Sequence, residues 1–87
     1  MYTSHAQARC QQRGIPAQAV DALLAYGTLK RHRGADIYYL DKRARSRAQS
    51  ALGPSYRRLE KALNSYVVVG DNGAIITAAK RHHRLKF

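Results

Sequence analysis

The spacing of hydrophobic residues along the chain changes several times, and each change marks a predicted element. Spacings of three and four residues between positions 4 and 27 are typical of helices. The period then changes, and two segments rich in β-formers, TLKRHRG and ADIYYLDK, predict strands. Residues 41–63 return to helical spacing, and SYVVVG and AIITAAKR give the strongest strand signals. The predicted order of elements is therefore α-α-β-β-α(α)-β-β.

The first predicted helix, at residues 5–13, has sequence signals at both ends. Ser4 is a suitable N-cap, and Gln7 three residues later completes a capping box. Gly14 supplies a left-handed position after the last turn, and Ile15 is placed to pack back on the helix. We therefore expect a short, sharply bounded helix.

Pro16 suits the first turn of a second helix, and Gly27 ends that helix. Tight turns are predicted at Gly34–Ala35 and at 71–73, where Asn72 and Gly73 would fill positions of positive φ. Gly53–Pro54 interrupts the later helical region. The positions expected to face the core are Val20, Leu23, Leu24, Ala44, Ala48, Ala51, Leu52, Tyr56, Leu59, Ala62 and Leu63.

Four strands with short connections predict one antiparallel sheet, so the fold class is α+β. The two N-terminal helices are expected to cover one face of this sheet. The other face stays open, at least in part, or is flanked by the helical segment inserted between the second and third strands. The chain shows no internal repeat, no long linker and no low-complexity tract, so residues 1–87 form a single domain.

Charge changes this picture because it is large and unevenly distributed. The chain has 16 Lys and Arg against 5 Asp and Glu, a formal net charge of +11. Residues 1–29 carry 2 basic residues and 1 acid, for +1, whereas residues 30–87 carry 14 basic and 4 acidic residues, for +10. Such a positive field attracts polyanions, most often nucleic acid, although an acidic membrane surface or an acidic protein is an alternative partner.

Several kinds of chemistry are excluded or disfavoured. Cys10 is the only cysteine, so no internal disulfide forms, and its place among small apolar residues indicates packing rather than nucleophilic chemistry. The acids are scattered singly, and no glycine-rich nucleotide loop is present. We therefore expect no metal and no cofactor. Without a signal-peptide core or an apolar run of transmembrane length, we expect a cytoplasmic protein with no membrane partner.

A stripe of basic residues runs along the first predicted helix. His5, Arg9 and Arg13 recur every four residues and so share one face. Ala6 and Cys10, four residues apart, are the apolar positions expected to pack, so the helix packs through a narrow face and leaves the basic stripe exposed. No acid lies within a turn of the stripe, so either solvent screens it or an anion binds it.

The C-terminal run KRHHR carries a second set of candidate residues. In an extended strand, Arg81 and His83 fall on one face, and Lys80, His82 and Arg84 on the other. Histidines beside cations suffice to cleave RNA without metal, because they can exchange protons with the 2′-hydroxyl and the leaving oxygen. A basic tail that only binds phosphate is the alternative.

Tyr38 and Tyr39 occupy opposite faces of one predicted strand, so they cannot both lie in the core. We select Tyr39 for the open face, where a tyrosine can stack on a base.

The run H-A-x-x-R-x-x-x-R-G-I, here His5-Ala6…Arg9…Arg13-Gly14-Ile15, resembles the N-terminal motif of a bacterial domain-of-unknown-function family. The segment from Tyr66 to Val69, the Asp-Asn-Gly turn and the segment from Ile75 to Thr77 agree with it. That family is commonly grouped with the RelE/ParE-like toxins. The resemblance covers both ends of the chain, whereas residues 35–63, with their extra basic helices, depart from the simplest members.

This resemblance implies a RelE-like fold, with two N-terminal helices against an antiparallel sheet. RelE-type members cut RNA, often on the ribosome, with basic residues instead of metal. A toxin-like, metal-independent endoribonuclease is therefore one implied function. A non-catalytic module for RNA, ribosome or DNA is an alternative, as is a protein-directed inhibitor of the ParE type, which acts on a topoisomerase. An acidic antitoxin-like protein is a further implied partner.

Two sets of candidate residues follow. Proton transfer is assigned to His5, His82 and His83. Contacts with nucleic acid are assigned to Arg9, Arg13, Tyr39, Arg43, Arg47, Lys80, Arg81 and Arg84.

Overall fold

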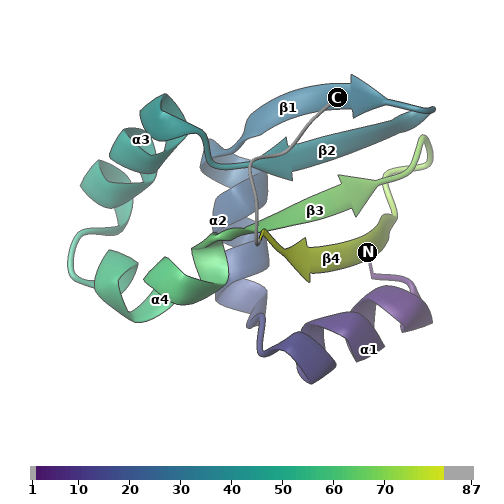
Figure 1. Cartoon of the computed structure of the whole chain (residues 1–87), viewed down its shortest axis with the longest axis horizontal. Helices are drawn as coiled ribbons and strands as arrows, with labels where there is room; N and C mark the ends of the chain where they lie inside the picture. Colours follow the sequence, from purple (N-terminus) through teal and green to yellow (C-terminus); the bar gives the residue numbers. More distant parts are fainter. Residues whose placement is uncertain (1, 82–87) are drawn as a thin grey trace.

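A computed structural model describes residues 2–81 of the chain, and within them it contains four helices and four strands (Figure 1). In chain order, the elements are α1 (Ser4–Arg13), α2 (Ala17–Tyr26), β1 (Thr28–His32), β2 (Ala35–Tyr39), α3 (Lys42–Leu52), α4 (Ser55–Leu63), β3 (Ser65–Val69) and β4 (Ile75–Lys80). This confirms the predicted α+β class and the order of elements.

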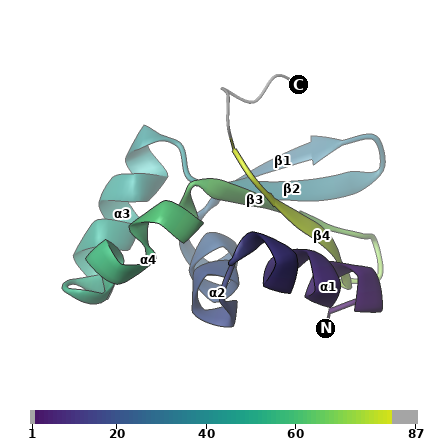
Figure 2. The same ribbon diagram turned by 60° about the horizontal axis from the view of Figure 1, so that its bottom comes forward.

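The strands form one antiparallel sheet in the order β1-β2-β3-β4. Helices α1 and α2 lie on the same side of this sheet, as predicted (Figure 2). Helix α1 packs along β4, whereas α2 contacts β2 and β3 and also α3 and α4. The α3–α4 pair stands beside one end of the sheet, so no described helix covers the second face (Figures 1 and 2).

The core lies between the sheet, the two N-terminal helices and the α3–α4 pair. Val67 on β3 and Ala78 on β4 face each other across the strands, and both are fully buried. Helix α1 contributes Ala6 and Cys10, the two residues that the sequence predicts. The other fully buried large side chains are Leu23, Leu40, Leu63 and Val20. Helices α3 and α4 add Ala44, Ala48, Tyr56, Leu59 and Ala62 to the same core, so α2 packs against both the sheet and this helix pair.

The N-cap of α1 is Thr3 rather than the predicted Ser4. The side-chain oxygen of Thr3 accepts a hydrogen bond of 3.1 Å from the backbone N–H of Ala6. The backbone N–H of Thr3 also donates to the carbonyl of Ile75, at 3.0 Å, so β4 holds Thr3 in the extended conformation that an N-cap needs. This tertiary contact shifts the cap by one residue.

The C-terminal end of α1 agrees with the sequence. Gly14 has φ 65°, a left-handed conformation that glycine adopts without a steric cost. The backbone N–H of Ile15 donates to the carbonyl of Cys10, at 2.9 Å, which closes a Schellman-type cap. Ile15 is buried, so it packs back on the helix as predicted.

The two hairpin turns follow different rules. Between β1 and β2, Arg33 and Gly34 both have positive φ, at 51° and 78°, as a two-residue turn of type I′ requires. Between β3 and β4, only Gly73 has positive φ, so the prediction for Asn72 is wrong. The side-chain oxygen of Asn72 instead accepts a hydrogen bond from the N–H of Ala74, at 3.0 Å, and stabilises the turn in that way.

The α3–α4 region is close to expectation. Asp41 caps α3 by accepting a hydrogen bond of 2.8 Å from the N–H of Ala44, and this bond lowers the pKa of Asp41. Most of the predicted inward positions are buried or half-buried, but Ala51 is exposed. None of the helices within residues 2–81 is long and apolar enough to cross a membrane.

The shifted cap gives a direct test. Replacing Thr3 with Ala leaves the N–H of Ala6 without its acceptor, so the free energy of unfolding should fall by about 1 kcal/mol. Replacing Ser4 with Ala, one residue inside the helix, should change it by less than about 0.5 kcal/mol. Urea unfolding followed by circular dichroism measures both. An equal loss in the two variants would contradict the cap assignment.

Candidate nucleic-acid interface

The sheet face opposite α1 and α2, which we call the open face, is identified from the strand register. Residues directly across two paired strands point to the same side, so Tyr38 lies on the helix-covered side with Val67 and Ala78. The alternate residues form the open face: Thr28, Lys30, His32, Ala35, Ile37, Tyr39, Tyr66, Val68, Thr77 and Ala79. Those on the three strands β2 to β4 are all half-buried. The face thus has an apolar and aromatic middle with basic residues at its β1 edge.

Two tyrosines are paired at the end of this face nearest to α3 and α4. Tyr39, the last residue of β2, lies directly opposite Tyr66, the second residue of β3. Side chains in such a cross-strand pair have Cβ atoms about 5 Å apart. The neighbouring Tyr38 points to the other side of the sheet, so the structure places on the open face the tyrosine that we selected from the sequence.

Arg81 follows β4 and is held over this aromatic pair by several contacts. Its guanidinium lies 5.3 Å from the centre of the Tyr39 ring and donates to the carbonyl of Leu40 at 3.0 Å. Its backbone N–H donates to the carbonyl of Asn64, at 2.8 Å, and its own carbonyl accepts from the Asn64 side chain, at 3.0 Å. A cation stacked on an aromatic ring beside further aromatic surface suits a phosphate flanked by bases.

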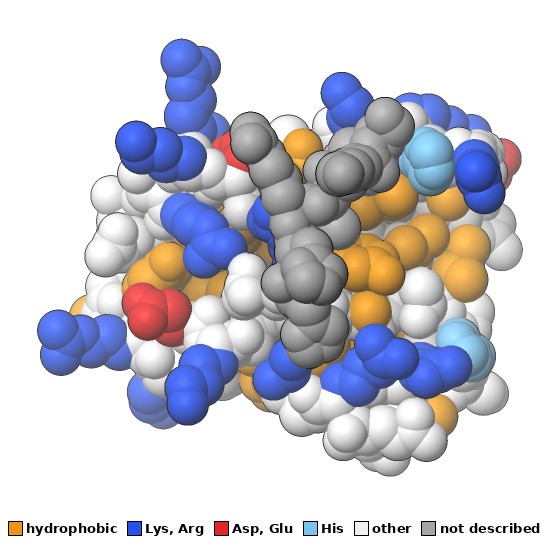
Figure 3. All heavy atoms as spheres, viewed as in Figure 1, with side chains coloured by type: hydrophobic (Ala, Val, Ile, Leu, Met, Phe, Trp, Pro, Cys, Tyr) orange, Lys and Arg blue, Asp and Glu red, His pale blue; other side chains and the backbone are white. Residues whose placement is uncertain are grey.

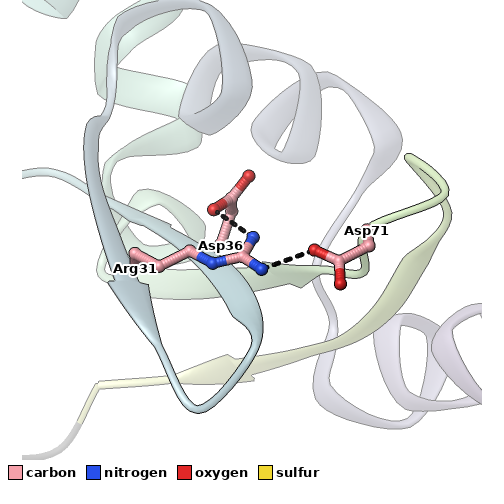
Figure 4. A network of polar contacts seen from close by, with 3 residues as sticks. All are labelled: Arg31, Asp36 and Asp71. Carbon is pink, nitrogen blue, oxygen red and sulfur yellow. Dashed lines mark hydrogen bonds and ion pairs between the residues drawn. The ribbon is translucent and has the colours of Figure 1, made fainter.

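No acidic side chain lies on the open face within residues 2–81. Asp36 and Arg31 fall on the helix-covered side by alternation, where Arg31 bridges Asp36 and Asp71 at 3.1 and 2.6 Å (Figure 4). The hydrogen bond with Asp71, and then the one with Asp36, raises the pKa of Arg31. Asp41 is engaged as the cap of α3. Asp41 also accepts a hydrogen bond from the side chain of Thr28, so it is the described acid that borders the open face, at its β1 edge.

The basic stripe of α1 borders the open face on the β4 side. Within the stripe, His5 and Arg13 are exposed and Arg9 is half-buried. Viewed onto the open face, basic side chains are visible over α1 along the adjoining edge of the sheet (Figure 3). The stripe can therefore contact a ligand that extends beyond β4.

Of the three proton-transfer candidates, only His5 lies within the described residues, and the other histidine there, His32, is not a candidate. His5 lies on α1 beside β4, and His32 lies on β1 at the opposite edge. Three strand spacings separate these edges, roughly 14 Å, which is too far for both imidazoles to reach one phosphate. His82, His83 and Arg84 lie outside the described residues.

The remaining candidates fall on different surfaces. Lys80 pairs with the buried Ser65, so it lies at the end of the helix-covered side, away from Arg81. Arg43 and Arg47 are exposed on α3, and Arg47 also donates to the carbonyl of Tyr26 at 3.1 Å. The structure therefore groups Tyr39 with Arg81 but separates both from Lys80.

Sequence analysis missed several residues of the open face, chiefly Tyr66, Lys30 and Asn64. Strand alternation from Val67 would have assigned Tyr66 to the open face once the inward side of β3 was known. Placing Lys30 on the open face requires the register of β1 against β2, which pairs Lys30 with Ile37. The role of Asn64 in holding Arg81 has no sequence signal, because the two residues meet only through the fold.

Other features of the described residues do not suit nucleic acid or metal. No group of three or more His, Cys, Asp and Glu in that part of the chain could hold a metal ion. A groove of about 680 Å³ where α1 joins α2 is lined by Tyr2, Gln7, Cys10, Gln11, Gly14, Ile15, Pro16 and Ala17. It has no charged side chain, so it does not match a polyanion.

Comparisons with known proteins add no relative. No family model matches the chain, and neither a curated protein nor a solved structure matches it significantly. Fold geometry and surface chemistry must therefore carry any functional assignment.

The environment of Cys10 predicts an unreactive thiol. The side chain is only 7 % exposed, and burial raises its pKa. The reaction with Ellman's reagent requires a deprotonated Cys10 thiol that the reagent can reach. At pH 8 the reagent should therefore modify the folded chain at least about tenfold more slowly than the chain in urea. The Cys10→Ala variant provides the blank. Comparable rates in the two states would mean that Cys10 is available for chemistry.

Proposed function

We propose that this chain is a RelE-like protein that binds single-stranded RNA across the open face of its sheet. Two bases stack on the Tyr39–Tyr66 pair, and Arg81 contacts the phosphate between them. The single observation that carries this proposal is the grouping of Tyr39, Tyr66 and Arg81 on a sheet face without acidic residues in the described part of the chain.

The chemistry of this face favours an unpaired strand over other ligands. Base–aromatic stacking contributes about 1–3 kcal/mol per base, but it requires bases that are free of a duplex. The half-buried aliphatic residues Ile37 and Val68 extend the platform toward the other end of the strands. Lys30 at one edge of the open face and the α1 stripe at the other can contact the RNA backbone where the strand enters and leaves this face.

The RelE-like part of the proposal rests on chain order and on the N-terminal motif. Two helices precede the sheet and cover one of its faces, which agrees with the fold that the resemblance implies. Residues His5, Arg9 and Arg13 carry the motif, and they border the open face rather than the core.

Adjacent tyrosines on opposite sides of β2 make a matched test. Fluorescence anisotropy with a labelled, unstructured RNA of about eight nucleotides, in EDTA, measures the dissociation constant. Replacing Tyr39 with Leu should raise it roughly fivefold to a hundredfold, because one stacked base is lost. Tyr38→Leu, which changes the same side chain on the helix-covered side, should raise it less than about twofold.

Two further measurements make this test decisive. Tyr39→Phe keeps the ring and should bind nearly as tightly as the unchanged chain, which separates stacking from the hydroxyl. Thermal unfolding of each variant shows that the chain is folded at the assay temperature. The proposal fails if the unchanged chain does not bind the RNA, or if Tyr39→Leu and Tyr38→Leu weaken binding equally.

The same samples decide whether the bound RNA is cut. Cleavage without metal would leave 2′,3′-cyclic phosphate ends on a denaturing gel, and loss of these products in His5→Ala or His83→Ala would identify the proton-transfer group. Intact RNA with tight, salt-sensitive binding would identify a binding module. If no RNA binds, a protein target such as a topoisomerase or an acidic partner replaces RNA as the leading alternative.

A further inference from the structure

A second cationic surface lies beside the aromatic end of the open face, on α3 and α4. Residues 42–63 contain seven Lys and Arg and a single acid, Glu60. Six of these cations are exposed: Lys42, Arg43 and Arg47 on α3, and Arg57, Arg58 and Lys61 on α4. Of these, Arg47 and Arg58 lie toward α2, where Arg47 donates to the carbonyl of Tyr26 and Arg58 lines a pocket with Asp21. Viewed onto the open face, Lys and Arg side chains are visible over both helices, with acidic side chains among them (Figure 3).

The two surfaces are continuous. Strand β2 ends at Tyr39 and leads within two residues into α3, and α4 leads directly into β3, where Tyr66 is the second residue. The paired tyrosines therefore stand at the end of the sheet where the α3–α4 pair begins.

Asn64, between α4 and β3, links the two surfaces through hydrogen bonds. Its side-chain oxygen accepts from the guanidinium of Arg45 on α3, at 3.0 Å, and its side-chain nitrogen donates to the carbonyl of Arg81, at 3.0 Å. One polar side chain thus positions a cation from each surface at the boundary between them.

The two surfaces differ in what they can recognise. The open face has exposed aromatic area, whereas the one aromatic residue of α3 and α4, Tyr56, is 6 % exposed and belongs to the core. A surface with cations and no accessible rings can contact phosphates but cannot stack on bases. Duplex RNA presents phosphates and 2′-hydroxyls and keeps its bases paired, so it suits such a surface.

We infer that the RNA bound by this chain carries a duplex directly beside its unpaired segment, with the unpaired bases on Tyr39 and Tyr66 and the duplex backbone on α3–α4. The inference rests on the proposed function, because it names the class of RNA that the open face takes. A stem-loop is the simplest RNA of this class.

Three RNA probes test the inference. The first is an unstructured strand of about eight nucleotides, the second holds the same nucleotides as the loop of a hairpin with a stem of about ten base pairs, and the third is the stem closed by a minimal loop. We expect the hairpin to bind at least about tenfold more tightly than the strand, with a steeper dependence on salt concentration. The stem with the minimal loop should bind more weakly than the hairpin, because it offers no unpaired segment.

A matched pair of variants shows which surface provides the additional affinity for the hairpin. Arg43→Gln with Arg57→Gln removes two charges from α3–α4 and should reduce the ratio of hairpin affinity to strand affinity toward one, while strand affinity changes less than about twofold. Arg9→Gln with Arg13→Gln removes the same charge from α1 and should leave that ratio unchanged. Because both variants lose two charges, the comparison between them removes the general effect of net charge.

The outcomes separate this inference from the proposed function. If the strand binds through Tyr39 but the stem adds no affinity, or if both variants lower the ratio equally, the inference is overturned and the proposed function stands. If the strand does not bind and Tyr39→Leu has no effect on the hairpin, the proposed function itself is wrong. Retention of the full ratio in the α3–α4 variant would also overturn the inference.

Discussion

Burial of two short helices against one face of a four-stranded sheet is the constraint on which the rest of this structure depends. Helix α1 has only Ala6 and Cys10 to bury, and α2 adds Ala19, Val20, Ala22 and Leu23. These side chains pack against one sheet face, where Val67 and Ala78 are fully buried, and α2 also packs against α3 and α4. A chain of 87 residues has little apolar material left for a second layer, so the other face is not covered by any described helix.

The high positive charge is tolerated because of how the few acids are placed. Arg31 bridges Asp36 and Asp71 and so ties the first hairpin to the turn of the second (Figure 4). Asp41 is used as the cap of α3. Each of these carboxylates is engaged in local structure, and Asp41 also contacts Thr28 at the edge of the open face, so the net charge around that face stays positive. The same arrangement that stabilises the two hairpins thus also prepares a surface for nucleic acid.

Much of the fold could be predicted because its signals are local. Gly14 ends α1 and Gly53–Pro54 separates α3 from α4, as the sequence indicates, and the first turn, predicted at Gly34–Ala35, forms one residue earlier, at Arg33–Gly34. The errors arose in two ways: a distant contact competes with the local rule at the N-cap of α1, and a local side-chain hydrogen bond replaces positive φ in the second turn. Thr3 replaces Ser4 as the N-cap because β4 fixes its backbone, and Asn72 acts through its side chain rather than through positive φ.

The sequence by itself determined the order of elements, the fold class and the basic stripe, since each depends on the spacing of neighbouring residues. It also determined that Tyr38 and Tyr39 point to opposite sides of a strand. Only the tertiary structure decided that Tyr39 shares a face with Tyr66, and that Asn64 joins Arg45 to Arg81. These relations depend on strand register and on hydrogen bonds between residues far apart in the chain, which local spacing does not specify.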